Sequence, residues 1–217
     1  MRRYVPWTGL FSVLIAWGTL GCVNPVEAAS QAPGTRVLLL THPSVDAGVV
    51  SNALTWAEQN TYVQWKHRVG AFEGGQTVDA LMADLATENK PEWFGVIGLG
   101  PLDKSVTAHE QVDTNRMVAV VNTTALAHED TKIFTRRLER MLIRGYASLL
   151  GVGHSPNPRC CLFDYKQLAH LDQIGRNCCP PFEIKMRKLG NQQGVAARAL
   201  PRPPAHLLRK PATGKKK

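Results

Sequence analysis

The most informative segment of the chain is Arg144–Leu162, "RGYASLLGVGHSPNPRCCL". It closes a long amphipathic segment with Gly151 and Gly153, and then presents His154, a proline-rich turn and a pair of cysteines. Glycines directly after a periodic apolar segment are typical of a helix C-terminus. We therefore predict a helix over 131–150 that ends in a bend just before His154.

The rest of the chain alternates between strand and helix patterns. Apolar runs and period-two alternation predict strands, and apolar residues at helical spacing predict helices. The expected strands are 36–41, 61–69, 93–100 and 116–122; the expected helices are 45–59, 78–87, 164–175 and 182–189; and 101–115 is expected to be a polar loop. This order predicts an α/β fold with a mixed sheet packed with helices.

Composition and charge exclude several classes of protein. The chain has 217 residues, of which 44% are hydrophobic and 20% charged, which is too apolar for a disordered chain. The net charge of +9 is concentrated at the end, because ten of the 26 Lys and Arg follow Glu183 and no acidic residue does. We therefore predict a disordered basic tail over 191–217, able to bind an anionic surface, and no nucleic-acid partner.

The N-terminus has the layout of a secretory signal peptide. Two arginines precede the apolar run "WTGLFSVLIAWGTL", and small residues follow it. We expect a signal peptide over 1–28, a linker over 29–35, and a secreted or periplasmic protein. The alternative is an envelope protein that is lipid-anchored at Cys22.

Four cysteines remain after export, namely Cys160, Cys161, Cys178 and Cys179. An even number of cysteines in an exported protein predicts disulfides, and four thiolates in two adjacent pairs are alternatively able to hold a structural zinc.

The stretch around His154 resembles the second half of a metzincin zinc signature, in which three His and one Glu are spaced along a helix and a turn. With His154 as the last ligand, Gly151 occupies the position of the signature's glycine. The first His, the Glu and the second His then fall on Arg144, Gly145 and Ser148.

The residues after His154 narrow the resemblance to archaemetzincins, whose four cysteines hold a second, structural zinc. Ser155 stands in place of the first of these cysteines, Cys160 matches the second, and "RNCCPPF" matches the last pair with Cys179 and Phe182. The resemblance implies a metzincin-like single domain over 36–190 with a Cys-rich C-terminal part.

The departures from this pattern predict a protein without a working zinc site. His154 is the sole remaining catalytic-zinc ligand, since an arginine neither accepts a hydrogen bond nor binds a metal. Cys160 and Cys179 are the remaining structural-zinc positions, and the resemblance places them close together. We therefore expect disulfides, Cys160 with Cys179 and Cys161 with Cys178, to replace the structural metal.

Other candidates carry less weight. His154, His170 and Asp164 or Asp172 offer ligands for a new site, but nothing in their spacing demands one. His109-Glu110 and His128-Glu129 are interpreted as solvated surface residues. Arg144 is either an anion-binding residue in the former cleft or one of a row of surface arginines on its helix.

The prediction for function is a catalytically inactive, archaemetzincin-like pseudo-peptidase that acts as a binding or structural domain, for a peptide or an anionic ligand, without a cofactor. The alternative is a zinc-dependent metallopeptidase with an unconventional metal site.

Overall fold

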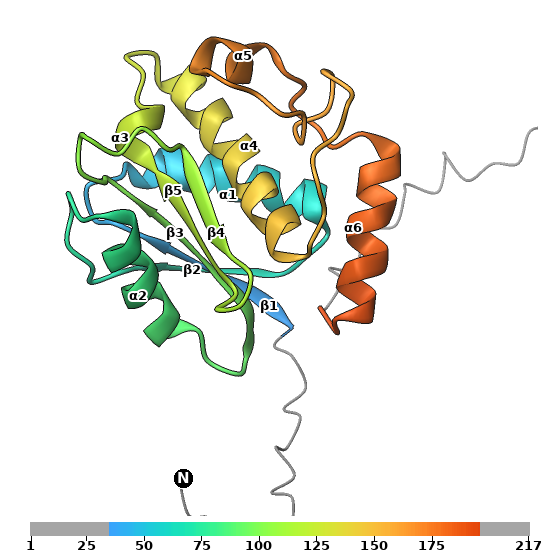
Figure 1. Ribbon diagram of the computed structural model, residues 1–217, viewed down its shortest axis with the longest axis horizontal. Coiled ribbons are helices and arrows are strands. Elements are labelled where there is room, and N and C mark those ends of the chain that lie inside the picture. The colour runs from blue at the N-terminus through green and yellow to red at the C-terminus, as the bar shows by residue number, and fades with distance from the viewer. Residues whose placement is uncertain (1–34, 196–217) are drawn as a thin grey trace, which may run out of the picture. The chain divides into compact units, whose positions relative to one another are not determined.

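Five strands form the central sheet of the protein, and the computed structural model describes residues 35–195 around it (Figure 1). The strand order is β2-β1-β3-β5-β4. Only β4 runs antiparallel to its neighbour, so the sheet is mixed as predicted. The strands are β1 (Arg36–Thr41), β2 (Trp65–Val69), β3 (Trp93–Gly100), β4 (Glu110–Asp113) and β5 (Val118–Asn122).

The three inner strands confirm the prediction of buried strands. Helices cover β1, β3 and β5 on both sides, so their sequences are continuous apolar runs rather than alternating ones. Two boundaries differ from the prediction because the backbone turns left-handed there. Tyr62 (φ 57°) separates α1 from β2, and Met117 (φ 55°) delays the start of β5 to Val118.

The segment expected to be a loop, 101–115, contains the strand β4. Its sequence, "EQVD", has no strand pattern of its own, and it is held extended by antiparallel pairing with β5. This pairing places Glu110 opposite Val121 at the edge of the sheet.

Helices cover the two faces of the sheet unequally. One face packs against α1 (Ala47–Thr61) and α4 (Thr131–Leu149), and the other packs against α2 (Val78–Glu88) (Figure 1). The remaining helices are α3 (Thr123–Leu126), α5 (Leu168–Gln173) and α6 (Pro180–Gln192). The predicted helices are therefore present, although α5 is shorter than 164–175 and α6 is longer than 182–189.

The helix α4 positions the candidate site. Asp130 caps its first turn by accepting a hydrogen bond from the backbone of Lys132, and Gly151 follows its end with a φ of 75° that favours glycine. The arginines at 137, 140 and 144 share one side of α4 and are each about 95% buried. The alternative interpretation of Arg144 as a surface arginine is therefore wrong, because β4 and the segment 160–176 cover this polar side.

Several predictions fall on residues outside 35–195. The signal peptide over 1–28, most of the linker, Cys22 and the basic tail from residue 196 onward all belong to this group. The predicted start of the tail is too early, since α6 continues to Gln192. Within the described residues, no helix is both long enough and apolar enough to cross a membrane.

Candidate functional site

Arg144 is the centre of the site predicted from the sequence. Its side chain is 5% exposed, and its Nε donates a hydrogen bond to Glu110 Oε1 at 3.0 Å. Its Nη1 donates to the carbonyl oxygens of Phe163 at 2.8 Å and Cys161 at 3.3 Å. The guanidinium also lies 4.9 Å from the centre of the Tyr165 ring. Arg144 therefore ties α4 to β4 and to the segment 161–165.

Glu110 lies in an environment that its sequence context does not predict. It was expected to be solvated, but its side chain is only 16% exposed and faces Arg144. Burial raises the pKa of Glu110, and the neighbouring guanidinium opposes the rise. Its Oε2 is buried and has no hydrogen-bond partner among the described residues. No local signal distinguishes this glutamate, since its burial follows from the pairing of β4 with β5.

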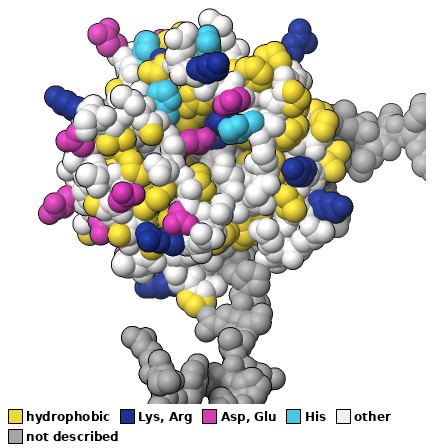
Figure 2. Space-filling model, viewed as in Figure 1, with side chains coloured by type: hydrophobic (Ala, Val, Ile, Leu, Met, Phe, Trp, Pro, Cys, Tyr) yellow, Lys and Arg dark blue, Asp and Glu magenta, His cyan; other side chains and the backbone are white. Residues whose placement is uncertain are grey.

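His154 lies at the edge of this network. Its side chain is 54% exposed, and its Nδ1 lies 3.7 Å from Asp164 Oδ1. Its Nε2 lies 3.4 Å from Nη2 of Arg144. The face shown in Figure 2 has acidic, basic and histidine side chains in contact near its middle. His109 stacks on Tyr165 at a ring separation of 5.5 Å, and burial lowers the pKa of this histidine.

The other two signature positions do not contribute to this network. Gly145 is buried against the sheet, where a Cβ would lie 3.3 Å from Cδ1 of Ile97. Ser148 is partly buried one turn after Arg144. Neither residue offers a group that binds a metal together with His154.

The alternative site built from His154, His170 and an aspartate is only partly assembled. Asp164 lies beside His154, but Asp172 forms an ion pair with Arg137 at 2.6 Å. His170 is hydrogen-bonded to Gln167 at 3.1 Å. Across residues 35–195, no group of three or more His, Cys, Asp or Glu is arranged to hold a metal ion. His128 and Glu129 are exposed, as expected.

The four cysteines lie together but form no disulfide. Cys179 is the N-cap residue of α6. Its backbone N–H donates a hydrogen bond of 3.1 Å to Cys160 Sγ, and the two sulfurs are not bonded. Both predicted bridges are therefore absent from the structure. The sulfur of Cys160 instead lies at a helix N-terminus, where a thiolate is favoured.

The electrostatics of this cysteine cluster are strongly asymmetric. Hydrogen bonds from the side chain of Cys161 and from the side chain and backbone N–H of Cys179 lower the pKa of Cys160. The hydrogen bond to Cys160 raises the pKa of Cys161, and burial raises that of Cys179. Ser155, which stands at the first cysteine position of the family pattern, has its Oγ 3.5 Å from Cys179 Sγ. Cys160 and Cys179 therefore lie close together, as the resemblance implies, and Ser155 lies beside them.

The architecture is similar to that of three solved structures. An archaemetzincin from Methanopyrus kandleri aligns with a TM-score of 0.57 at 17% identity, over 76% of this chain and 98% of that one. A zinc-dependent peptidase from Methanocorpusculum labreanum aligns with a TM-score of 0.59 at 14% identity, over 69% and 99%. An archaemetzincin from Archaeoglobus fulgidus, complexed with malonate, aligns with a TM-score of 0.52 at 14% identity, over 69% and 99%.

Comparison by sequence gives no match, either to a family model or to a curated protein. The structural likenesses are therefore likenesses of fold, and they confirm the α/β, metzincin-like architecture expected from the sequence.

Proposed function

We propose that this chain is an exported, archaemetzincin-like protein that has lost zinc peptidase chemistry and acts as a binding or structural domain. The observation that carries the proposal is the environment of Arg144. The sequence resemblance aligns this residue with the first metal-binding histidine, and its guanidinium bonds to Glu110 and to two backbone carbonyls.

The donor set at this place does not fit a zinc ion. Of the three histidine positions of the signature, only His154 holds a histidine, and its Nε2 lies 3.4 Å from a guanidinium that carries a permanent positive charge. At a separation of about 4 Å and an effective dielectric constant near 20, the repulsion between a divalent ion and a guanidinium is roughly 8 kcal/mol. Glu110 keeps one oxygen without a hydrogen-bond partner, but its negative charge is already paired with Arg144.

In place of a metal, the ion pair joins three parts of the chain. Glu110 belongs to β4, Arg144 belongs to α4, and the carbonyls of Cys161 and Phe163 belong to the turn that follows α4. A buried guanidinium with several acceptors holds such segments in a fixed arrangement. We propose that this network keeps the former cleft in shape without a catalytic ion.

A ligand of the former cleft would meet His154, Asp164 and the exposed part of Tyr165 rather than a zinc-bound water. The carboxylate of Glu110 is bound to Arg144, at the place where an external anion was expected from the sequence. Binding of an external carboxylate, such as the C-terminus of a peptide, would require competition with Glu110, and this remains a prediction.

The test combines metal content with activity. The full chain, purified with zinc present and then dialysed, is expected to contain far less than one zinc per chain by plasma mass spectrometry and to cleave no member of a peptide library. One bound zinc together with peptidase activity, both lost in His154→Ala and both retained in His128→Ala, would overturn the proposal. That result would establish the alternative, a zinc-dependent metallopeptidase with an unconventional site.

The proposed export is tested separately. A mature N-terminus at Ala29 supports a soluble secreted or periplasmic protein, whereas incorporation of a labelled lipid that is lost in Cys22→Ser supports an anchored one. An intact Met1 in protein recovered from cells would contradict both.

A further inference from the structure

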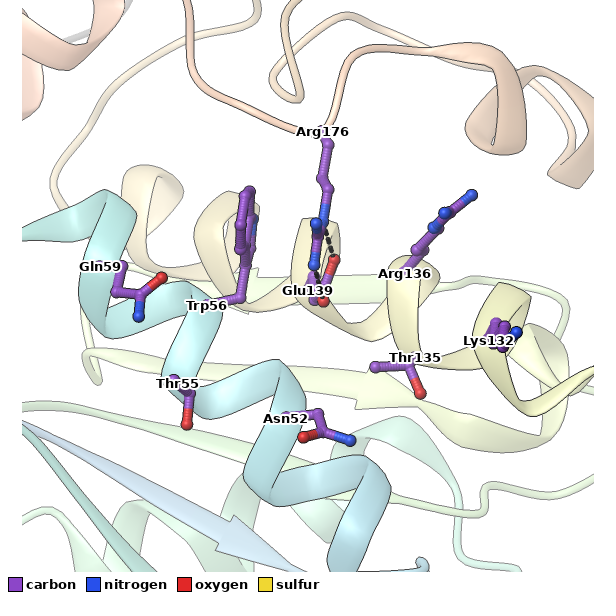
Figure 3. Close-up of a pocket in the computed structure, with 9 residues that line it drawn as sticks. All are labelled: Asn52, Thr55, Trp56, Gln59, Lys132, Thr135, Arg136, Glu139 and Arg176. Atoms are coloured by element: carbon purple, nitrogen blue, oxygen red, sulfur yellow. Dashed lines mark hydrogen bonds and ion pairs between the residues drawn. The ribbon is translucent and has the colours of Figure 1, made fainter.

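A second polar site lies on another side of α4. A cavity of about 400 Å³ opens between α1 and α4 (Figure 3). Its lining residues are Asn52, Thr55, Trp56, Gln59, Lys132, Thr135, Arg136, Glu139 and Arg176. By helical spacing, the α4 residues of this lining project from a different side of the helix than Arg144 does. The cavity is therefore separate from the site described above.

One wall of the cavity is a stacked ion pair. The carboxylate of Glu139, whose side chain is 3% exposed, accepts hydrogen bonds of 2.5 Å from both Nε and Nη2 of Arg176. The same guanidinium lies 3.4 Å above the centre of the Trp56 ring (Figure 3). Such paired contacts fix a guanidinium in place and neutralise the buried carboxylate. Glu139 consequently leaves little negative charge for the rest of the cavity.

The remaining charged groups of the lining are both positive. Lys132 and Arg136 lie one helical turn apart on α4, both are exposed, and neither forms a salt bridge with an acidic residue among residues 35–195. A cavity lined by an excess of positive charge concentrates anions.

The neutral groups of the lining add hydrogen-bond donors. Trp56 Nε1 is buried and has no partner in the described part of the chain. This nitrogen is closed to solvent in the structure, so Trp56 lines the cavity with its ring rather than with its N–H. Asn52, Gln59 and Thr135 contribute amide and hydroxyl groups from the two helices that flank the cavity (Figure 3).

We infer that this cavity binds a small anion that carries several acceptor oxygens, of the phosphate or carboxylate class. Lys132 and Arg136 supply the charge, the amide and hydroxyl groups of the lining supply neutral hydrogen-bond donors, and Arg176 with Glu139 forms the rigid wall. The volume is that of a site for a small molecule rather than for a chain segment. The inference is independent of whether the chain is a peptidase.

The test uses the indole N–H of Trp56 as a reporter. The full chain, labelled with ¹⁵N-tryptophan, is titrated with sodium pyrophosphate and, separately, with citrate at low ionic strength. The resonance of Trp56 is identified from its loss in Trp56→Phe. We expect this resonance to shift in a saturable manner with at least one probe. The resonances of Trp65 and Trp93, which lie outside the cavity lining, are expected to stay in place.

The matched variants separate a built site from general attraction between charges. The double variant Lys132→Gln/Arg136→Gln is expected to weaken binding about tenfold or more, because charge-assisted hydrogen bonds are lost. The control Lys90→Gln/Lys104→Gln removes the same charge outside the cavity, and it is expected to keep affinity within about threefold of the wild type. Unchanged Trp65 and Trp93 resonances show that each variant is folded.

Each outcome has a defined meaning. Binding of pyrophosphate alone assigns the phosphate class, binding of citrate alone assigns the carboxylate class, and binding of both assigns a general oxyanion site. Absence of a saturable Trp56 shift with either probe, or an equal loss of affinity in both double variants, would overturn the inference.

Discussion

Replacement of Arg144 by methionine is the perturbation that most directly tests the role of the buried network. Methionine keeps most of the side-chain volume but removes the guanidinium from Glu110, Cys161 and Phe163. Removing one partner of a buried ion pair leaves the other charge uncompensated, which costs roughly 3–5 kcal/mol. The arginine and the glutamate are 5% and 16% exposed, so solvent screens little of this interaction.

We therefore expect Arg144→Met to lower the free energy of unfolding by about 4 kcal/mol, which corresponds to a decrease in Tm of roughly 8–16 °C for a domain of this size. Urea unfolding followed by circular dichroism measures the first quantity, and calorimetry measures the second. The matched control is Arg68→Met, which breaks an ion pair with Glu88 whose side chains are 50% and 38% exposed. Such an exposed pair contributes about 0–1 kcal/mol.

The pH dependence gives the experiment a second readout. Without Arg144, burial of Glu110 is opposed only by the charge of His154, so the pKa of this carboxyl in the folded state rises further above its unfolded value of about 4.3. A carboxyl whose pKa is higher in the folded than in the unfolded state stabilises the fold at low pH. This contribution is lost as pH rises through the folded pKa. Arg144→Met is therefore expected to be more destabilising at pH 8 than at pH 5, and addition of Glu110→Gln is expected to remove most of this difference.

The reasoning would be refuted if Arg144→Met lowered the free energy of unfolding by less than about 1 kcal/mol, which is no more than the loss expected for Arg68→Met. The same conclusion would follow if its destabilisation were independent of pH while the Glu110→Gln addition changed nothing.

Three further predictions concern other parts of the same framework. Gly151→Ala is expected to lower the free energy of unfolding in urea by about 1–2 kcal/mol, because Gly151 has a φ of 75°. Its control, Gly153→Ala, is expected to lower this free energy by less than about 0.5 kcal/mol, because Gly153 has an ordinary backbone and open space for a Cβ. Equal losses in the two variants would contradict the assigned helix end. Hydrogen bonds from Arg137 lower the pKa of Asp172, so this pair stabilises the fold above the unfolded pKa of about 3.9 and the contribution is lost as pH falls through the lower folded pKa. Asp172→Asn should therefore be less stable than the wild type at pH 7 and equally stable near pH 2. A difference in the free energy of unfolding that does not change with pH would count against the ion pair. When the reduced native protein is briefly alkylated, mass spectrometry is expected to find the label first on Cys179, the one partly exposed thiol of the cluster. If all four sulfurs of the unreduced exported protein fail to react, that result would instead support the disulfides predicted from the sequence.

The sequence predicted the regular elements where their patterns are local. The runs at 36–41 and 93–100 are strands at the predicted positions, because a strand buried on both faces must be apolar at every residue. The long helix begins at Thr131 as predicted and ends one residue early, because an aspartate cap and a following glycine are encoded within a few residues of each end. The likeness to archaemetzincin structures was foreseen from the spacing of Gly151, His154 and Cys160.

The partners of polar side chains were decided by tertiary structure alone. Glu110 and Arg144 are 34 residues apart, and nothing near either one in the sequence indicates that pairing of β4 with β5 brings them together. The cysteines were expected to bond through their sulfurs, but the start of α6 presents the N–H of Cys179 to the sulfur of Cys160 instead. A sequence pattern thus determined which segments are apolar and where they end. The contacts of a buried charge depend on which distant segment covers it, and only the folded chain determines that.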